Sequence, residues 1–249
     1  MSETLLHTDD LTKKFGEFTA VDHVNFSIDR GAVEALIGPN GAGKTTFQNL
    51  ITGNLAPTEG TVHFDGRDIT ADEPYQRARR GIIRKYQVTS IYESQSVMEN
   101  VQLAIRGQIT SARELLTTHG NEDIRDRVDE LLSIAGLDDK ATETAGNLSY
   151  GEQQWLEIAM SLGADPDLLL LDEPTSGMSR GETNETVELI AEIQNKRDVS
   201  ILVIEHDMDF IKDVSESITV LHQGAIIAEG NAAEIKSNET VKEVYLGDS

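Results

Sequence analysis

The stretch GPNGAGKT, residues 38–45, decides the fold that we expect for this chain. It fits the pattern G-x-x-x-x-G-K-[ST] and lies between an apolar run, AVEALI, and a helix-compatible stretch, TTFQNLITG. A strand, a glycine-rich loop and a helix in this order are the context that the pattern requires. The stretch therefore predicts a loop whose backbone N–H groups hold phosphate where a helix begins.

The residue types of this loop suit a nucleoside triphosphate. Lys44 would reach the β- and γ-phosphates, Thr45 would bind Mg²⁺ and Thr46 would add a phosphate contact. The alternative, a glycine-rich turn that binds nothing, leaves the Lys-Thr pair and the flanking pattern unexplained. The predicted nucleotide-binding residues of the loop are Gly38, Pro39, Asn40, Gly41, Ala42, Gly43, Lys44, Thr45 and Thr46.

A second candidate element is LLLLDE, an apolar run that ends in Asp172 and Glu173. Ligands of open α/β sheets bind at the carboxyl edge of the strands, so Asp172 can hold Mg²⁺ while Glu173 faces an attacking water. Two acids at a strand end are weak evidence alone, because a solvated strand end looks the same. Together with the phosphate loop they predict a hydrolytic site.

The bulk composition bounds the class of protein. The 249 residues include no cysteine, which excludes a disulfide scaffold and a cysteine nucleophile and agrees with a reducing compartment. The N-terminus MSETLLHTDD does not resemble a signal peptide, and no apolar run approaches the roughly 18 residues of a membrane span. We therefore expect a cytoplasmic protein that meets a membrane only through a partner.

The charge of the chain is strongly acidic. Forty-four Asp and Glu residues against 21 Lys and Arg residues give a formal net charge of −23. Such a surface repels phosphates of nucleic acids and anionic lipid headgroups, so we expect neither nucleic acid binding nor direct membrane insertion. It also suits a salt-loaded, halophilic cytoplasm, where screening weakens repulsion among carboxylates; the alternative is an ordinary acidic protein.

The hydrophobic pattern predicts one α/β domain, residues 1–249, with an insert. Alternation in the first 35 residues indicates an antiparallel β part, and the fully apolar runs DLLLLDE and VSILVIEHD indicate buried strands of a parallel or mixed sheet. Apolar residues at spacings of three and four predict helices between them. We expect a core of about 1–87 and 163–249, interrupted by a helical insert of about 88–162.

The stretch NLSYGEQQWLEIAM separates this chain from other proteins with a phosphate loop. Here the sequence resembles the ATP-binding subunits of ABC transporters, whose signature is LSGGQ. Leu148 to Glu152 match that signature at three of five positions. The resemblance covers about residues 4 to 247. It implies an ATPase with the P-loop NTPase fold of that family, with ATP and Mg²⁺ as ligands.

Three further residues match the family in the expected order. Phe15 matches the aromatic residue that stacks on adenine, Gln87 the glutamine that joins the core to the helical insert and reaches Mg²⁺, and His206 the histidine at the γ-phosphate. The resemblance gives Glu173 the role of general base, with Lys44 and His206 stabilising the developing charge. Each match alone would be weak, but their order along the chain is specific.

The resemblance also implies partners. Two ATPase subunits, identical or paralogous, would face each other so that each ATP lies between the phosphate loop of one chain and the signature residues of the other, which are Ser149, Tyr150, Gly151 and Glu152. Two transmembrane permease subunits would place the pair at the inner face of the cell membrane, with a solute-binding protein acting indirectly. The predicted permease contact lies near Gln87 to Asn100, where Val88, Ile91, Tyr92 and Val97 offer apolar contacts or simply pack the insert.

Within the family, the likeness is greatest to ATPases that power uptake of branched-chain amino acids or of urea and short amides. The segments RARRGIIRKYQ, WLEIAM, EHDMDF and TVLHQG carry this likeness. Three positions depart from the general pattern: Tyr150 replaces a glycine, Glu152 a glutamine and Ser179 an aspartate that helps two subunits communicate. The alternatives that we keep are a lipid-export ATPase and a soluble ABC-type ATPase acting on DNA or ribosomes.

Overall fold

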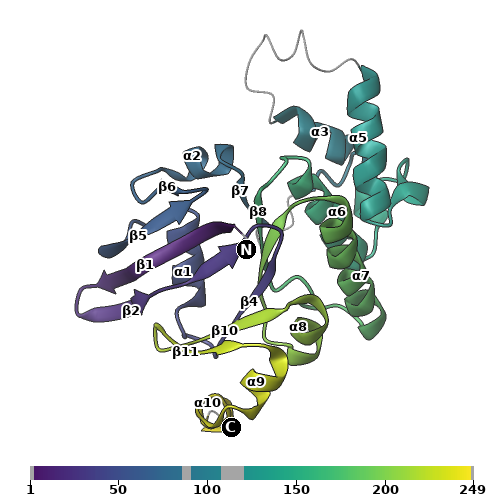
Figure 1. Cartoon of the computed structure of the whole chain (residues 1–249). Helices are drawn as coiled ribbons and strands as arrows, with labels where there is room; N and C mark the ends of the chain where they lie inside the picture. Colours follow the sequence, from purple (N-terminus) through teal and green to yellow (C-terminus); the bar gives the residue numbers. More distant parts are fainter. Residues whose placement is uncertain (1–2, 86–90, 108–120, 248–249) are drawn as a thin grey trace. The chain divides into compact units, whose positions relative to one another are not determined.

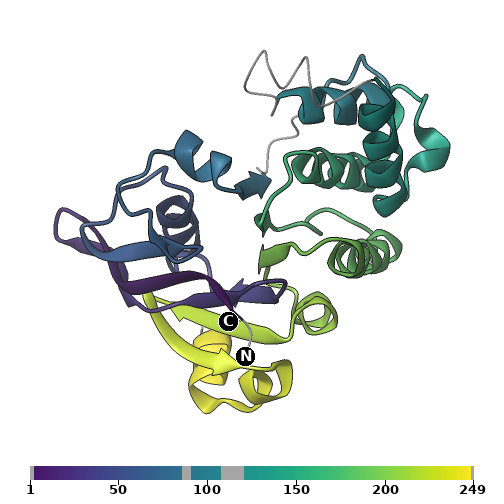
Figure 2. The ribbon, with the colours of Figure 1, turned by 45° about the horizontal axis from the view of Figure 1, so that its top comes forward.

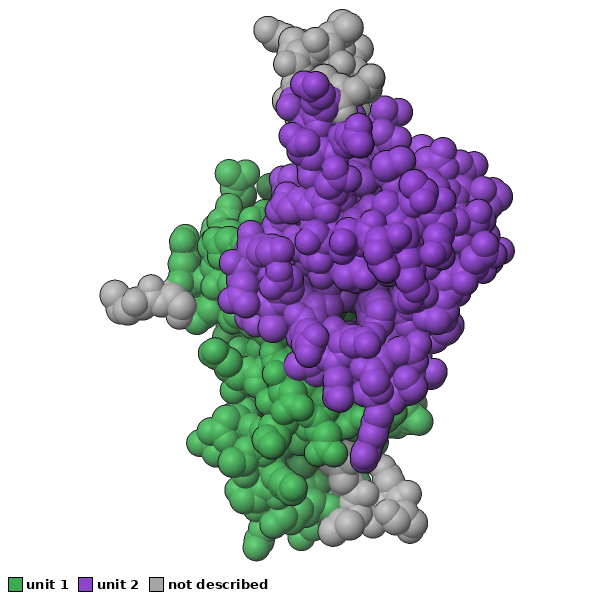
Figure 3. Space-filling model, turned by 90° about the vertical axis from the view of Figure 1, so that its right-hand side faces the viewer, with its two compact units in different colours: residues 1–83, 167–173, 198–249 green, residues 84–166, 174–197 purple. Residues whose placement is uncertain are grey.

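The computed structural model describes residues 3–85, 91–107 and 121–247. Contacts divide the chain into two units, which Figure 3 colours separately: unit 1 holds residues 1–83, 167–173 and 198–249, and unit 2 holds residues 84–166 and 174–197. This division differs from the predicted insert of 88–162, because unit 2 also takes in residues 174–197.

Unit 1 contains an antiparallel sheet at its N-terminal end (Figure 1). Its strand order is β2-β1-β5-β6, and β3 pairs with β1 as well. Polar and apolar residues alternate along these strands, so one face is buried and the other is exposed to solvent. The antiparallel part expected from the sequence is thereby confirmed. The strands are β1 (Thr4–Phe15), β2 (Phe18–Val24), β3 (Ser27–Asp29), β5 (Glu59–Phe64) and β6 (Arg67–Asp68).

The second sheet has the order β11-β10-β4-β9-β8-β7. Strands β10, β4, β9 and β8 pair in parallel, and β10 and β11 form an antiparallel hairpin. Gln223 and Gly224 turn this hairpin with φ values of 48° and 84°, as two-residue hairpin loops require. The strands are β4 (Val33–Ile37), β7 (Ile82–Lys85), β8 (Leu168–Asp172), β9 (Ser200–Ile204), β10 (Ser217–His222) and β11 (Ala225–Gly230).

Helices of unit 1 include α1, which follows the phosphate loop, and three near the C-terminus (Figure 1). The last of them, α10, lies at the C-terminal end of the described residues. The helices are α1 (Lys44–Ile51), α2 (Pro74–Arg79), α8 (Met208–Val214), α9 (Ala232–Ser237) and α10 (Glu239–Gly247).

Unit 2 is helical, and Figure 2 shows its teal and green helices packed together. The helix α7 packs against α5 and α6, which explains why it belongs to this unit rather than to the core. The indole Nε1–H of Trp155 on α6 donates a 2.9 Å hydrogen bond to the hydroxyl of Thr186 on α7. The elements are α3 (Val97–Gly107), α5 (Asn121–Ile134), the 3-10 turns Asp138–Lys140 and Ala145–Asn147, α6 (Tyr150–Leu162) and α7 (Arg180–Lys196).

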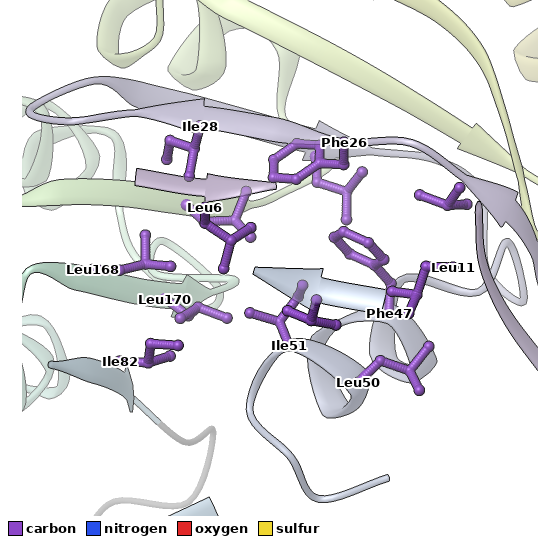
Figure 4. Close-up of a cluster of buried hydrophobic side chains, with 14 of the residues drawn as sticks. Leu6, Leu11, Phe26, Ile28, Phe47, Leu50, Ile51, Ile82, Leu168 and Leu170 are labelled. Carbon is purple, nitrogen blue, oxygen red and sulfur yellow. The ribbon is translucent and has the colours of Figure 1, made fainter. Parts of the chain in front are cut away.

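The core of unit 1 lies where α1 packs against both sheets (Figure 4). Phe26 and Phe47 meet edge to face with ring centroids 5.3 Å apart, and both are almost completely buried. Buried apolar side chains from β1, β5 and β8 complete the cluster. Burial of this surface is the main stabilising term for the unit. Among the described residues, no helix is both long enough and apolar enough to cross a bilayer.

Arg77 on α2 is a buried cation that fixes the end of α1. Its side chain is only 1% exposed, and its guanidinium donates to the carbonyl oxygens of Leu50 and Ile51 at 2.6 and 2.9 Å. It also donates to the carbonyls of Thr70 and Asp72 at 3.1 Å each. Burial lowers the pKa of Arg77, and the negative charge of Asp72 opposes that shift. The guanidinium thus satisfies carbonyls that the last turn of a helix leaves without partners.

We expect Arg77→Met to destabilise the protein by about 3 kcal/mol or more, because buried carbonyls left without donors cost roughly 1–3 kcal/mol each. Urea denaturation of the purified chain measures this loss. Arg79→Met is the matched control, since Arg79 lies on the same helix with an exposed side chain. Equal stabilities of the two variants would contradict the capping role of Arg77.

Candidate nucleotide site

The parallel register of the second sheet brings the candidate residues to one edge. Ile204 pairs with Asp172 on one side and with Leu36 on the other, so β8, β9 and β4 end in line. The loops that follow these strands begin with Gly38, Glu173 and Glu205. All three loops therefore start at the carboxyl edge of the sheet, where open α/β sheets bind their ligands.

The glycine-rich loop reaches α1 through a backbone that needs glycine. Gly43 has φ 106°, and a Cβ built on it would lie 2.4 Å from the carbonyl oxygen of Ala20. The loop is also tied to the β10–β11 turn, because Gly224 N–H donates a 2.8 Å hydrogen bond to the carbonyl of Ala42. No side chain caps the N-terminus of α1, and its first turn holds no acid. Its N–H groups are therefore available to an anion.

Lys44 is the cation of this site, and it is half-buried. Its ammonium group donates to the carbonyl oxygens of Gly38 and Pro39 at 2.5 and 3.0 Å. Burial lowers the pKa of Lys44, and the nearby carboxylates of Glu173 and Asp172 act in the opposite direction. A partly desolvated ammonium group gains strongly from a phosphate that replaces its lost water.

A cavity of about 330 Å³ lies at this edge. Its lining brings together all three loops: Gly38, Pro39, Asn40, Lys44, Glu173, Ile204, Glu205 and His206. Glu173 sits there with φ 46°, a left-handed conformation that is rare outside glycine, and its N–H donates to the carbonyl of Ile204 at 2.8 Å. Such a backbone outlier at a strand end is typical of functional sites.

Glu205 is a residue of this cavity that the sequence reasoning missed. It is 1% exposed, accepts a 2.9 Å hydrogen bond from the backbone N–H of its neighbour His206, and lies 3.4 Å from the Nδ1 atom of that ring. The ring itself is largely exposed. A glutamate directly after the apolar run VSILVI was the available signal, because buried acids need specific partners.

The remaining predicted residues of the nucleotide site lie near the surface of unit 1 or outside the described part of the chain. Phe15 ends β1 with 48% of its surface exposed, and it pairs across the turn with Phe18, which is 65% exposed and was not predicted. Thr45 is exposed and Thr46 is half-buried at the beginning of α1. Gln87 lies outside the described residues.

The residues present fit a nucleotide and Mg²⁺. The cradle at Gly43 admits no side chain, the N-terminus of α1 has no side-chain cap, and Lys44 is partly desolvated beside two acids. The hydroxyl of Thr45 and the carboxylate of Asp172 are hard oxygen ligands, which Mg²⁺ prefers. The donor set is thus that of a phosphate site with an adjacent magnesium position.

The signature residues lie in unit 2, at the N-terminus of α6. Ser149 caps the helix, because its hydroxyl accepts from the N–H of Glu152 at 3.3 Å while the Glu152 carboxylate accepts from Ser149 N–H at 2.8 Å. Glu152, which replaces the glutamine of the family signature, forms an ion pair with Lys140. Burial would raise the pKa of Glu152, but the hydrogen bond from Lys140 and those at Ser149 lower it overall.

A carboxylate from α7 lies against the signature. A Cβ built on Gly151 would be 2.6 Å from Oε1 of Glu182, so a side chain at this position would push the carboxylate aside. The backbone and hydroxyl of Ser179 donate to Glu182 at 2.8 Å each. These hydrogen bonds lower the pKa of Glu182, and the N–H of Gly151 and the hydroxyl of Ser149 contribute to the shift. Ser179, the departure noted in the sequence, is therefore the N-cap of α7.

Residues predicted to contact a permease divide into three groups. Val97 is completely buried in unit 2, so of the two alternatives stated for it, packing of the helical insert applies and surface contact does not. Tyr92 is 56% exposed and Ile91 is half-buried. Val88 lies outside the described residues.

Comparison with known proteins identifies the family. The sequence profile of the family described as ABC transporter matches residues 21–176. This chain belongs to the ABC transporter family. A second profile, described as branched-chain amino acid ATP-binding cassette transporter, matches residues 225–249. The resemblance inferred from the phosphate loop and the signature is confirmed, and the chain is an ABC-type ATPase.

Full-length relatives and solved structures agree with this assignment. The chain is 38% identical to the high-affinity branched-chain amino acid transport ATP-binding protein LivG of Salmonella typhimurium and 34% identical to BraF of Pseudomonas aeruginosa, with complete coverage of both chains in each case. The ADP conformation of MJ1267, an ATP-binding cassette of an ABC transporter, covers 99% of this chain and is itself covered in full. It gives a TM-score of 0.87 at 31% identity. The predicted ABC ATPase fold is thus confirmed.

Replacement of Gly43 tests the shape of the phosphate loop. We expect Gly43→Ala to lower ATP affinity at least tenfold, because alanine adds about 1–2 kcal/mol of left-handed strain and a collision with Ala20. Gly41→Ala is the matched control: Gly41 has φ 80° but open space around a Cβ, so its loss should be smaller. Titration with a fluorescent ATP analogue measures both affinities. Wild-type affinity in Gly43→Ala would refute this loop conformation.

Proposed function

We propose that the chain is the ATP-hydrolysing subunit that energises a membrane importer for branched-chain amino acids. The observation that carries this proposal is full-length identity of 34–38% to proteins named for branched-chain amino acid transport, together with the cavity that the phosphate loop, Glu173 and His206 line. None of the relatives described above supports urea as the substrate or a salt-adapted source. Those two expectations stay predictions.

The phosphate loop and Lys44 would hold the ATP phosphates. Backbone N–H groups of residues 38–46, other than Pro39, would meet the phosphate oxygens, and Lys44 would exchange its carbonyl partners for the β- and γ-phosphates. Phe15 would stack on adenine. Mg²⁺ would be held by Thr45, Asp172 and Gln87, and when bound it neutralises charge on the β- and γ-phosphates.

Glu173 is the proposed general base. It lines the same cavity as Lys44, and its left-handed backbone conformation fixes the position of its Cβ atom. A water in line with the γ-phosphate would pass a proton to Glu173 while Lys44 and His206 stabilise the charge that develops on the phosphate. Glu205, buried beside His206, would act as a positioning residue for that ring.

Two copies of the chain, or this chain and a paralogue, would close around ATP. Residues 38–46 of one subunit and Ser149, Tyr150, Gly151 and Glu152 of the other would grip each γ-phosphate from opposite sides. The relative MJ0796 supports this arrangement, since a dimeric post-hydrolysis state bound to ADP and Pi is known for it at 26% identity and a TM-score of 0.76. Hydrolysis would then release the dimer, because several charge-assisted hydrogen bonds are lost together.

The proposed dimer works on two transmembrane permease subunits, with a solute-binding protein delivering the substrate to them. The ATPase would thus be a peripheral protein at the cytoplasmic face of the cell membrane. The exposed ring of Tyr92 and the neighbouring Ile91 remain candidates for the permease contact. Closure around ATP would be transmitted to the permease through the helical unit.

The role of Glu173 is tested by Glu173→Gln. We expect this variant to bind ATP as the wild type does and to lose roughly 10²–10⁴-fold in turnover, because an amide cannot accept the proton of the attacking water. Phosphate release and nucleotide titration measure the two properties separately. Glu17→Gln, an identical change in the exposed β1–β2 turn, should hydrolyse ATP normally. Near-normal turnover of Glu173→Gln would remove the assignment.

The position of Glu182 predicts that its carboxylate opposes closure of the dimer. Its carboxylate lies beside Gly151, close to the Gly151 N–H and the Ser149 hydroxyl, which are the donors that the partner's ATP would need. Glu182→Gln removes the competing charge but keeps a residue type that serves the cap of α7. We therefore expect it to dimerise at a several-fold lower ATP concentration.

Analytical ultracentrifugation in the slowly hydrolysing Glu173→Gln background measures the dimerisation midpoint. Glu185→Gln, one turn away at an exposed position of α7, is the control and should leave the midpoint unchanged. An unchanged or higher midpoint for Glu182→Gln would show that the carboxylate does not compete with the nucleotide.

A further inference from the structure

The solvent-exposed (wet) face of the antiparallel sheet carries two histidines and an aspartate side by side. His7 on β1 pairs directly with His63 on β5, and the two strands lie next to each other (Figure 1). Asp9 follows His7 by two residues and therefore shares its face. The intervening and flanking residues of the opposite face, Leu6, Thr8, Val62 and Phe64, are buried. The three polar side chains thus point away from the core.

The ligand-type atoms of these side chains converge. Oδ2 of Asp9 lies 3.6 Å from Nε2 of His7 and 3.7 Å from Nε2 of His63, and all three ligand atoms lie within 4.8 Å of one another. Two ligands bound at about 2.1 Å to a tetrahedral ion are about 3.4 Å apart. The observed separations are close to that value, so small side-chain rotations bring the three atoms to one centre.

We propose that His7, Asp9 and His63 form a binding site for a late first-row divalent metal ion, with Zn²⁺ as the representative. Two imidazole nitrogens and one carboxylate oxygen are a ligand set that Zn²⁺ prefers, whereas Mg²⁺ prefers oxygen ligands only. Water completes the coordination at this exposed face. The site shares no residue with the phosphate cavity.

Binding asks for two local adjustments that the structure permits. The imidazole rings are stacked 4.6 Å apart with an angle of 2° between their planes, so they must tilt toward each other before both lone pairs meet one ion. His63 must also release Thr61, whose hydroxyl lies 3.1 Å from its Nε2 atom. Both rings are only partly buried, with side-chain exposures of 39% and 26%, which leaves room for rotation.

The surroundings favour a cation. Asp68 on β6 lies opposite His63 in the register, which places a further carboxylate on the same wet face. The chain as a whole carries a formal charge of −23, which raises the concentration of cations at its surface.

A bound ion would link β1 to β5 beside a weak point of their pairing. The register shifts between Asp9 and Thr12, so Asp9 is the last residue paired before the irregularity. Such bulges locally interrupt the hydrogen-bond ladder. A metal bridge between the two strands would secure the ladder there.

The test uses the full-length protein, free of nucleotide and of Mg²⁺, titrated with Zn²⁺ alone in competition with a chromogenic chelator. We expect one equivalent to bind the wild type, and His7→Gln and His63→Gln to weaken that binding at least tenfold, since loss of even an outer-shell partner costs about 10–100-fold. Circular dichroism and ATP binding confirm that each variant is folded.

The matched control is His23→Asn. His23 is an exposed histidine whose Nδ1 lies 2.7 Å from Asp22, so it forms a histidine–aspartate pair outside the cluster. Its φ of 46° is one that asparagine tolerates well. Zn²⁺ binding by this variant should match that of the wild type.

Two further measurements keep the proposal falsifiable. Asp9→Asn, at a side chain that is 63% exposed, repeats the test if a histidine variant does not fold. Co²⁺ in place of Zn²⁺ should give visible d–d bands in the wild type and in His23→Asn but not in the cluster variants. Wild-type affinity and stoichiometry in His7→Gln and His63→Gln, or an equal loss in His23→Asn, would overturn the site.

Discussion

The parallel register of β4, β9 and β8 is the constraint on which the nucleotide site depends. Because the three strands end together, the loops after Ile37, Asp172 and Ile204 begin at one edge and meet in one cavity. A slip of one residue in a parallel pair would move every side chain of that strand to the other face. The left-handed backbone at Glu173, tied to Ile204, is held by this register.

Local electrostatics explain how an acidic chain can hold a polyphosphate. The surface as a whole repels anions, but the beginning of α1 presents uncapped N–H groups, and Lys44 has lost part of its hydration. In unit 2 the corresponding donors near Gly151 face the carboxylate of Glu182. The N-termini of α1 and α6 thus both place partial positive charge where a negatively charged oxygen atom can bind.

Much of the fold could be predicted from the sequence, because the deciding signals are local. Apolar runs of four residues, LLLL and ILVI, identify buried parallel strands, and G-x-x-x-x-G-K-[ST] needs left-handed backbone that only glycine supplies readily. The boundary of the helical unit was harder to predict from the sequence. The sequence pattern assigned residues 174–197 to the core because they lie between two core strands in the chain. In the structure, their helix packs against α5 and α6.

The sequence by itself determined the family, the phosphate loop and the order of strands and helices, since each depends on residue types at short spacing. Only the tertiary structure decided which distant groups meet. Arg77 lies 26 residues from the carbonyl of Ile51 that it caps, and His7 is brought to His63 by strand pairing. Glu205 belongs to the cavity through the register of β9. Such contacts depend on register and packing between segments far apart in the chain, which no local pattern specifies.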